Sequence, residues 1–515
     1  MNTLVIVLIA IVVLGAGYVL YGRHIAKSWG IDPKAETPAV KYNDGKDFVP
    51  TNGWTVFSHQ FSSIAGAGPV TGAIQAAVFG WVPVLLWILI GGVFFGAVTD
   101  FGALYASVKN EGKSMGMLIE KYIGKLGRKL FTIFCWLFSV LIIAVFADMV
   151  TGTFSAFDAE TLQKLPTAGV NGSAGMVSIM FMVFAVVFGL IQKKWNLTGW
   201  KEFVVGVVFI VASFAVGIKV PIIMGKTQWA AVVFAYIFLA AIMPIWLMKQ
   251  PRDYMTTIMF VCMIAGAIIG LVIGHPTMEL PAFTGFNNEK LGTMFPILFV
   301  TVACGAVFLE SVLAVLALCV AGAAAKNGVA AEGTPFQIFS RGVAGFFEKM
   351  GVPVQVATVF MTMCVSALAL TTLDAVARIG KMSFQEIFSV DDMKHAALWR
   401  KVVCNPYFAT IITLLCGYVL TKVGYQQIWP LFGSANQLLS ALVLITLCVF
   451  LKVTGRKNKI LFPPMIIMLC VTFTALVQRL IAMIKAIQQA AAVGIPAGQT
   501  SWGAVFIANG LQLII

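Results

Sequence analysis

Charged side chains are scarce in this sequence: Asp, Glu, Lys and Arg together make up 11% of its 515 residues. A soluble globular chain carries about 25%, so that class is excluded. In their place are hydrophobic residues, which make up 60% of the chain and form long runs separated by short polar loops. A membrane-spanning helix needs about 20 mostly apolar residues, and the ten-residue alternation of a membrane β-barrel is not visible. The composition therefore predicts an all-α polytopic membrane protein.

Motifs of catalysis and of metal or nucleotide binding are also missing. No two of the nine cysteines form Cys-x-x-Cys, and all nine lie in apolar segments, which favours packing over disulfides or metal ligation. The stretch "GAGP" lacks the spacing of a dinucleotide fingerprint, and "EGKS" has Ser107 where a phosphate loop needs its first glycine. The histidines lie in separate segments without metal spacing; they are His24, His59, His275 and His395. We expect no enzyme, no metal and no cofactor.

The formal net charge of +14 at pH 7 raises the question of a polyanionic partner. The basic residues are scattered through loops beside apolar runs, where topology and anionic lipid headgroups account for them. We therefore expect membrane lipids around the chain and no nucleic acid. The oligomeric state stays open.

The apolar runs predict about 13 to 14 transmembrane helices. They lie near 3–22, 54–79, 81–108, 128–152, 172–191, 200–220, 229–249, 254–274, 294–324, 354–378, 403–421, 428–452, 460–484 and 502–515. The positive-inside rule places the most basic loops in the cytoplasm; these are Lys109 to Lys129, Gln192 to Lys201, Lys249 to Arg252, Arg378 to Lys401 and Lys452 to Lys459. Loops 153–171 and 275–293 are then outside, as is the N-terminus.

The number of predicted membrane crossings disagrees with the positive-inside rule at one place. If 294–324 and 354–378 each cross once, the basic loop after Arg378 would lie outside. Two full crossings need on the order of 40 residues, more than 294–324 can supply. Either this run is an unusual hairpin, or a segment is missing near Ala306 to Phe308.

The predicted organisation has five parts and no domain of soluble size. They are an extra N-terminal transmembrane helix (1–22), a cytoplasmic loop (23–53), a transporter core (54–378), a second cytoplasmic loop (379–402) and C-terminal transmembrane helices (403–515). The remaining long loop is Lys326 to Pro353. The second cytoplasmic loop contains "FQEIFSVDDMKHAALWRK", which suits an interfacial amphipathic helix or a plain solvated loop.

Ionisable residues inside spans are expensive, so each is a functional candidate. Glu310 in "FLESVLAVLAL" and Asp374 in "LTTLDAVARIG" have apolar flanks and are our first candidates for proton coupling. Asp100 and Asp148 follow them, since each lies toward the end of its span, where a carboxylate can also reach water or cap another element. Asp374 could instead pair with Arg378, four residues later on the same helix.

The stretch "FSSIAGAGPVTG" interrupts the run 54–79 with small residues and a proline. Close helix packing is one explanation; a helix break is the simpler one, because proline removes a backbone donor. Transporters bind substrates at such breaks. The predicted substrate-binding residues are Ser62, Ser63, Gly66, Ala67, Gly68 and Pro69, together with His59, which could equally be a packing histidine. An inverted repeat would place a partner break about five spans later, where Pro244 lies.

Several long motifs together resemble the carbon starvation protein A family of bacterial inner-membrane transporters. They are "DGKDFVPTNGWTVFSHQFSSIAGAGPVTG", "WILIGGVFFGAVTDFGAL", "QPRDYM", "VTVACGAV", "LTTLDAVARIGKMSFQEIF" and "IWPLFGSANQLLSALVL". The resemblance covers nearly the whole chain. It implies an inverted-repeat core related to the amino acid, polyamine and cation transporters, and proton-coupled uptake of peptides or pyruvate when carbon is scarce.

One departure from the family coincides with the failed crossing count. Family members typically continue after "ACGA" with Gly-Phe-His, Ser-Gly-Thr and Gly-Tyr-Gly stretches, whereas here Val307 is followed almost at once by "LESVLAVLAL". Two other functions stay open: a starvation sensor or regulatory subunit without transport, and a sodium-coupled transporter of small carboxylates or amino acids. The sequence does not choose among pyruvate, peptides and amino acids.

Overall fold

The structure is a computed structural model that describes most of the chain. The described residues are 2–44, 48–51, 53, 56–57, 60–61, 66–158, 161–195, 197, 199–244, 246–288, 291–302, 308–390 and 397–493. Within them the fold is helical apart from one two-stranded antiparallel hairpin, β1 (Asn287–Asn288) and β2 (Gly292–Thr293). The predicted all-α membrane fold is confirmed. The predicted terminal span at 502–515 lies outside the described residues.

The first half of the chain contains eleven α-helices and three shorter helical turns of other types among the described residues. They are α1 (Thr3–Ala16), η1 (Gly17–Gly22), α2 (Arg23–Ser28), α3 (Pro38–Lys41), α5 (Gly68–Ala76), η2 (Ala77–Phe79), α6 (Trp81–Gly91), η3 (Gly92–Gly96), α7 (Ala97–Lys109), α8 (Met115–Tyr122), α9 (Lys125–Phe154), α10 (Ala168–Trp195), α11 (Trp200–Lys219) and α12 (Lys226–Ile242). The segments η1 and η3 are π-helical, and each continues the α-helix before it.

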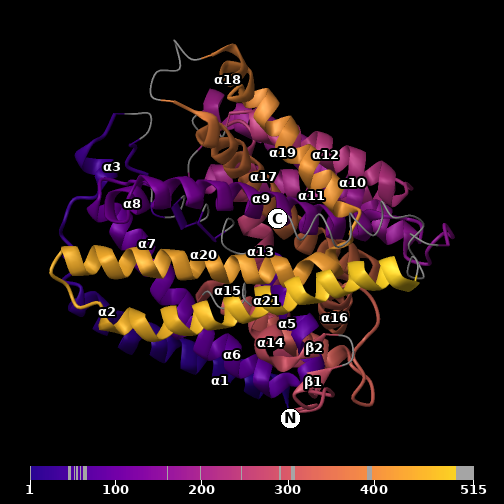
Figure 1. Ribbon diagram of the computed structural model, residues 1–515. Coiled ribbons are helices and arrows are strands. Elements are labelled where there is room, and N and C mark those ends of the chain that lie inside the picture. The colour runs from indigo at the N-terminus through magenta and orange to yellow at the C-terminus, as the bar shows by residue number, and fades with distance from the viewer. Residues whose placement is uncertain are drawn as a thin grey trace.

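The second half begins with a long helix and ends with two. Its elements are α13 (Lys249–Gly274), β1, β2, α14 (Met294–Thr301), α15 (Phe308–Ala324), α16 (Pro335–Lys349), α17 (Val354–Phe388), α18 (Leu398–Val403), α19 (Pro406–Thr421), α20 (Tyr425–Val453), η5 (Lys459–Leu461) and α21 (Phe462–Val493). Figure 1 shows α20 and α21 as a long antiparallel pair, joined by a short turn.

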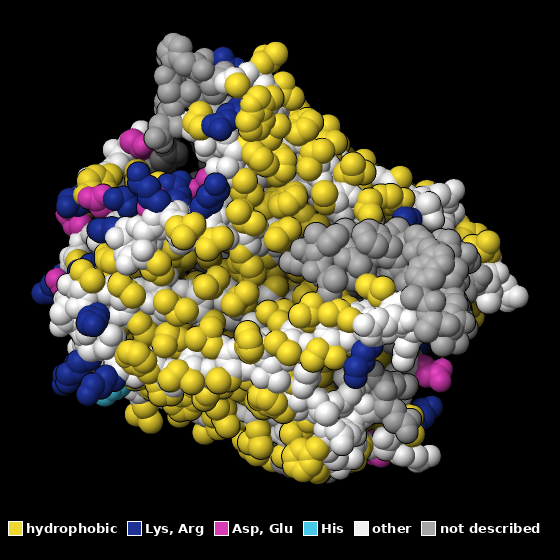
Figure 2. Space-filling model, viewed as in Figure 1, with side chains coloured by type: hydrophobic (Ala, Val, Ile, Leu, Met, Phe, Trp, Pro, Cys, Tyr) yellow, Lys and Arg dark blue, Asp and Glu magenta, His cyan; other side chains and the backbone are white. Residues whose placement is uncertain are grey.

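Nine described helices are long and apolar enough to cross a membrane, and four shorter apolar helices accompany them. The centre of the fold is the contact between α9 and α17. Of the most apolar 18-residue stretch of α17, 78% is buried inside the protein. The corresponding share in α11 is 22%, so α11 is a peripheral helix. Figure 2 shows hydrophobic side chains over the middle of one face, and most of the visible Lys and Arg side chains at the edge formed by α2, α7 and α8. This pattern is that of a multi-pass membrane protein, with its basic residues gathered at one end.

The run 294–324 is a hairpin of two short helices, and this explains the failed crossing count. The start of α14 is tied to the loop before it, because Met294 N–H donates to the Phe286 carbonyl at 2.7 Å. The end of α15 returns to the same loop, where Glu279 N–H donates to the Gly322 carbonyl at 3.0 Å. Both ends of the hairpin therefore lie on one side of the bundle, and the parity of the following helices is restored.

Two predicted boundaries were wrong. The segment Lys326 to Pro353 is not a loop: it contains α16, which Thr334 caps through the Gln337 amide and which packs on α13, α15 and α17. The span predicted at 354–378 continues as one helix to Phe388, so part of the predicted cytoplasmic loop is helical. The segment 391–396 of the same loop lies outside the described residues.

Pro244 does not interrupt a helix. The helix α12 ends at Ile242, and Leu247 N–H donates to the Pro244 carbonyl in the turn that leads to α13. The expected partner break in the middle of span 229–249 is thus wrong in position. The run 294–324, predicted as one span, contains two helices, α14 and α15, and residues 303–307 between them lie outside the described residues.

Candidate functional site

The segment around Gly66 and Ala67 lies outside regular helix, and α5 begins directly after it. Gly68 is the first residue of α5, and Pro69 occupies the first turn, where a proline costs no hydrogen bond. All four residues from Ala67 to Val70 are buried. The first turn of a helix leaves backbone N–H groups without intrahelical acceptors. The other predicted binding residues, His59, Ser62 and Ser63, lie outside the described residues.

Glu310 lies opposite this break, in the first turn of α15. The Gly66 N–H donates to its Oε1 at 3.5 Å, and only 8% of the residue is exposed. The helices α5 and α15 pack against each other. Their N-terminal ends thus both lie near the Glu310 carboxylate, and the positive end of a helix dipole favours a negative charge. The structure brings together two residues that the sequence placed in separate roles, Gly66 for substrate and Glu310 for the proton.

Asp100 joins this site from a third element. It lies in the first turn of α7, directly after the π-helical turn η3, and its side chain is exposed. It is close enough to Glu310 for the two carboxylates to repel each other when both are charged. The site therefore has two carboxylates beside two helix N-termini.

The end of α14 completes the surroundings of α5. The carbonyl of Phe299 accepts a hydrogen bond from Gln437 Nε2 at 2.7 Å, and that of Thr301 accepts one from Trp429 Nε1 at 3.4 Å. Both donors lie on α20. A helix that ends inside a protein needs such partners for its last carbonyls. The three short helices α5, α14 and α15 therefore have ends in the interior, as in transporters built from broken helices.

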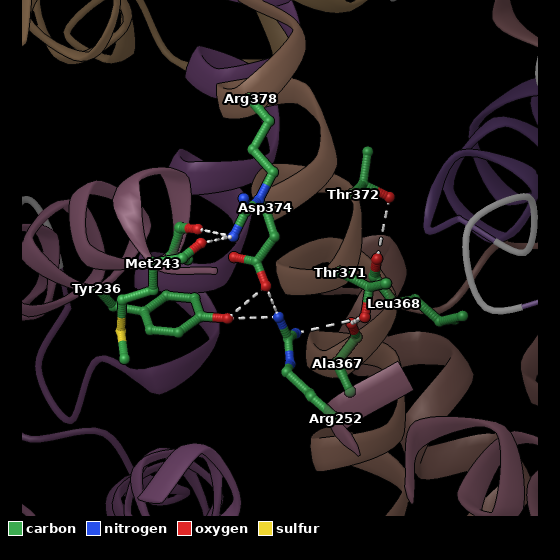
Figure 3. Close-up of polar contacts among 10 residues, drawn as sticks. Tyr236, Met243, Arg252, Ala367, Leu368, Thr371, Thr372, Asp374 and Arg378 are labelled. Carbon is green, nitrogen blue, oxygen red and sulfur yellow. Dashed lines mark hydrogen bonds and ion pairs between the residues drawn. The ribbon is translucent and has the colours of Figure 1, made fainter. Parts of the chain in front are cut away.

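Asp374 lies in a second buried cluster (Figure 3), with partners that differ from the expected one. Arg252 Nη1 is paired with Asp374 Oδ2, and the hydroxyl of Tyr236 donates to the same oxygen at 2.5 Å. Arg252 also donates through Nη1 to the Tyr236 hydroxyl and through Nη2 to Thr371 Oγ1 at 3.3 Å. Arg252 and Asp374 are 1% and 2% exposed. This charge pair is fully enclosed, and it joins α12, α13 and α17.

Arg378 does not pair with Asp374 in the structure. Its Nη2 donates to the carbonyls of Ala240 and Met243, the latter at 2.8 Å, and Lys381 Nζ donates to the Ala241 carbonyl at 2.8 Å. Both basic side chains thus satisfy the last carbonyls of α12, where a positive charge is favourable. The alternative of an Asp374–Arg378 pair along one helix is wrong.

Asp148 has two structural partners near the end of α9. Its Oδ1 is paired with Lys226 Nζ at 2.7 Å, and its Oδ2 accepts the Tyr425 N–H at 3.0 Å, at the start of α20. The carboxylate therefore caps another helix, which was one of the two roles open for it. It holds the ends of α9, α12 and α20 together.

Sequence reasoning missed Arg252 and Tyr236. The stretch Lys249 to Arg252 was assigned to a cytoplasmic loop, whereas α13 begins at Lys249 and Arg252 is buried in its first turn. A signal was available: a carboxylate deep in a span needs a partner, and Arg252 is a cation at the end of an apolar run. Among the described residues, no three His, Cys, Asp or Glu side chains are grouped as metal ligands would be.

Helices long and apolar enough to cross a membrane, short helices that end inside the bundle and an apolar outer surface define this chain as a multi-pass membrane protein. A family profile described as "Carbon starvation protein CstA" matches residues 2–312 and 309–475. The chain therefore belongs to this family, as the motifs predicted. The two matched segments meet at 309–312, beside the junction where the sequence departs from the family pattern.

Individual relatives cover different shares of the chain. Peptide transporter CstA of Escherichia coli (strain K12) is 32% identical over 322 residues, which is 59% of this chain and 44% of that protein. Pyruvate/proton symporter BtsT of the same organism is 33% identical over 324 residues, 59% of this chain and 43% of that protein. Peptide transporter CstA of Bacillus subtilis (strain 168) is 27% identical over 540 residues, 90% of this chain and 87% of that protein. The matched part is thus less than half of each E. coli protein.

Proposed function

We propose that this chain is a secondary active transporter of the bacterial inner membrane, which imports pyruvate or peptides together with protons during carbon starvation. Family membership and the names of the relatives support this, since they include peptide transporters and a pyruvate/proton symporter. The observation that carries the mechanism is the hydrogen bond from the Gly66 N–H to buried Glu310.

The coupling follows from competition for the same backbone groups. When Glu310 is charged, its carboxylate accepts the hydrogen bond of the Gly66 N–H and lies at the positive N-terminal ends of α5 and α15. When Glu310 takes up a proton, it becomes a weaker acceptor, and these groups are free to bind the carboxylate of a substrate. Substrate and proton then occupy the site together, as symport requires. Ser62, Ser63, Ala67, Gly68, Pro69 and His59 remain the proposed surroundings of the substrate.

The four carboxylates have different roles in this proposal. Glu310 carries the proton, and Asp100 assists by exchanging it with the exposed side of the site. Asp374 was proposed for coupling as well, but its charge is matched by Arg252, which supports a positioning role instead. Asp148 likewise positions three helix ends. Neither of these two needs to change its protonation state during transport.

Uptake into proteoliposomes tests the proposal. The purified full chain is reconstituted, and accumulation of labelled pyruvate and of a labelled dipeptide is measured with an inward proton gradient, an inward sodium gradient and no gradient. We expect accumulation of one substrate that depends on the proton gradient. Accumulation driven by sodium alone would favour the sodium-coupled alternative. Binding without accumulation would favour a sensor, and chemical conversion of the substrate would favour an enzyme.

A further inference from the structure

A polar cavity lies at the end of the bundle opposite the basic loops. Its volume is about 240 Å³, and it is lined where α9, α12 and the turn between α19 and α20 meet. The polar and charged side chains of its wall are Asp148, Thr151, Lys226, Thr227, Tyr418, Thr421 and Lys422. Neither Gly66 nor Glu310 lines the cavity, and the function proposed above assigns Lys422 no role.

The wall carries two ammonium groups and one carboxylate. Both oxygens of Asp148 are already occupied, by Lys226 Nζ and by the Tyr425 N–H. Lys226 keeps 38% of its side chain exposed and lines the cavity. Lys422 is exposed, with its Nζ 4.7 Å from the centroid of the Tyr418 ring. The cavity therefore offers donors and one net positive charge, which suits an anion.

Helix dipoles do not explain both of these lysines. Lys422 is the C-cap residue of α19, where a positive charge is favourable. Lys226 is the first residue of α12, where a positive charge is unfavourable to the helix. Its ion pair with the buried carboxylate of Asp148 offsets this cost, and Lys226 also lines the cavity.

Membrane topology does not explain them either. The helix α9 runs from the basic segment around Lys125 and Arg128 to its end at Phe154, so the cavity lies on the other side from the loops that the positive-inside rule assigns to the cytoplasm. Lysines are not required on that side for orientation. Their position is the one that an incoming substrate meets first.

We propose that this cavity is an outer docking site for the carboxylate group of the substrate, held between Lys226 and Lys422 before the substrate moves to the Gly66–Glu310 site. The inference rests on the proposed function for the identity of the ligand. A volume of 240 Å³ corresponds to about eight water molecules, which fits a small carboxylic acid or the C-terminal residue of a peptide. The hydroxyl of Thr227 offers a further hydrogen bond to such a group.

Transport kinetics give the first test. In proteoliposomes with a fixed proton gradient, Lys422→Gln and Lys226→Gln should each raise the half-saturating substrate concentration by about tenfold, the size of one hydrogen bond to a charged group. The maximal rate should change little in Lys422→Gln, and Lys422→Arg should restore the wild-type value. The control is Lys219→Gln, which removes the same charge from the same side at the exposed end of α11. Equal shifts in Lys422→Gln and Lys219→Gln would overturn the proposal.

Substrate protection gives a second test that does not depend on transport. A Lys422→Cys variant is labelled with a membrane-impermeant maleimide, and the native thiols are accounted for by labelling the unsubstituted protein. Pyruvate and dialanine should slow the labelling, and dialanine amide, which lacks the carboxylate, should not. Protection by pyruvate alone assigns a small-acid substrate, and protection by dialanine alone assigns a peptide. Absence of protection by both acids would overturn the docking site, whereas protection without uptake would leave it standing and count against the proposed transport.

Discussion

The Gly66 N–H and the Glu310 carboxylate, 244 residues apart in sequence, form a hydrogen bond at the junction of two short helices. This contact links the interruption before α5 to a buried acid on α15. The charged carboxylate of Glu310 is a stronger acceptor for the Gly66 N–H than the protonated acid is. The first prediction follows from that difference.

Glu310→Gln should separate substrate binding from proton coupling. Glutamine has nearly the shape of a protonated glutamate and cannot release a proton. We expect the variant to exchange external labelled substrate for internal unlabelled substrate, because exchange needs no net proton movement. Accumulation driven by a proton gradient should fall to that of protein-free liposomes. Both assays use the same proteoliposome preparation.

The matched control is Glu332→Gln, which makes the same change at an exposed glutamate in the loop before α16. It should leave both activities unchanged. If Glu310→Gln still accumulates substrate against a gradient, Glu310 is not the proton carrier. Asp100→Asn is then the next variant to measure, since Asp100 is the other carboxylate of that site.

Removing either partner of the Arg252–Asp374 pair should destabilise the protein. Each side chain is almost fully buried, and loss of one partner leaves an uncompensated buried charge, at a cost of about 3–5 kcal/mol. We expect Arg252→Met and Asp374→Leu to lower the melting temperature of the detergent-solubilised protein. The double variant should recover most of the loss, because it leaves no charge behind.

This cycle also distinguishes a structural role of Asp374 from one in coupling. If the double variant regains stability and proton-driven uptake, Asp374 is not needed to carry the proton. If the double variant regains stability but not proton-driven uptake, Asp374 takes part in proton coupling. The Arg378→Met variant serves as the comparison, since Arg378 donates its hydrogen bonds to the backbone carbonyls of Ala240 and Met243 at the C-terminal end of α12.

The helical membrane fold was predictable because it depends on composition and on the lengths of apolar runs. The Gly66–Glu310 site was predictable in its parts, since a proline with flanking glycines marks a helix break and an acid among apolar residues marks a functional group. Their contact was not predictable from periodicity. Nothing local in either segment indicates a partner 244 residues away.

The hairpin of α14 and α15 could not be located from the sequence, because hydropathy does not record where a helix ends inside an apolar run. The last carbonyls of α14 are satisfied by Gln437 and Trp429, which lie far away on α20. Arg252 was misplaced for a similar reason. From sequence alone, a charged residue at the edge of an apolar run is assigned to the adjacent loop. The partner that shows Arg252 to be buried, Asp374, lies far away in sequence on α17.

Gly72 and Gly433 should resist substitution, because each lies against the backbone at the end of α14. A Cβ atom on Gly72 would lie 2.3 Å from the Thr301 carbonyl oxygen, and one on Gly433 would lie 2.1 Å from that of Val300. Backbone must move to admit either methyl group, and overpacking of this kind costs about 1–3 kcal/mol. We expect Gly72→Ala and Gly433→Ala to lower the melting temperature and the rate of uptake.

The control for both is Gly152→Ala in α9, where an added Cβ would meet nothing within 4 Å. Alanine is the better helix former by up to about 1 kcal/mol, so this variant should be neutral or slightly stabilising. A loss of stability in Gly152→Ala as large as in the other two would mean that close approach to α14 is not the cause.

The hairpin predicts that the residues before α14 and after α15 are exposed on the same side of the membrane. The exposed positions Asn287 in β1 and Val329 after α15 flank the hairpin, and Lys457, between α20 and α21, is exposed at the other end of the bundle. Single cysteines at these positions, in a variant without the native cysteines, are labelled in intact cells with an impermeant maleimide. We expect labelling at 287 and 329, and labelling at 457 only after permeabilisation.

Labelling of positions 287 and 329 from opposite sides would mean that the segment 294–324 crosses the membrane. The basic loop after Arg378 would then be placed outside, against the positive-inside rule. Labelling of all three positions from the same side would leave the hairpin standing. It would instead contradict the assignment of the basic loops to the cytoplasm. The two outcomes differ because the hairpin concerns only the ends of α14 and α15, which are both bonded to the loop before α14: Met294 N–H donates to the Phe286 carbonyl, and Glu279 N–H donates to the Gly322 carbonyl. If the expected pattern is found, the short helices enter and leave on the side of the Lys226–Lys422 cavity, and their inner ends place Glu310 within reach of a substrate arriving from there.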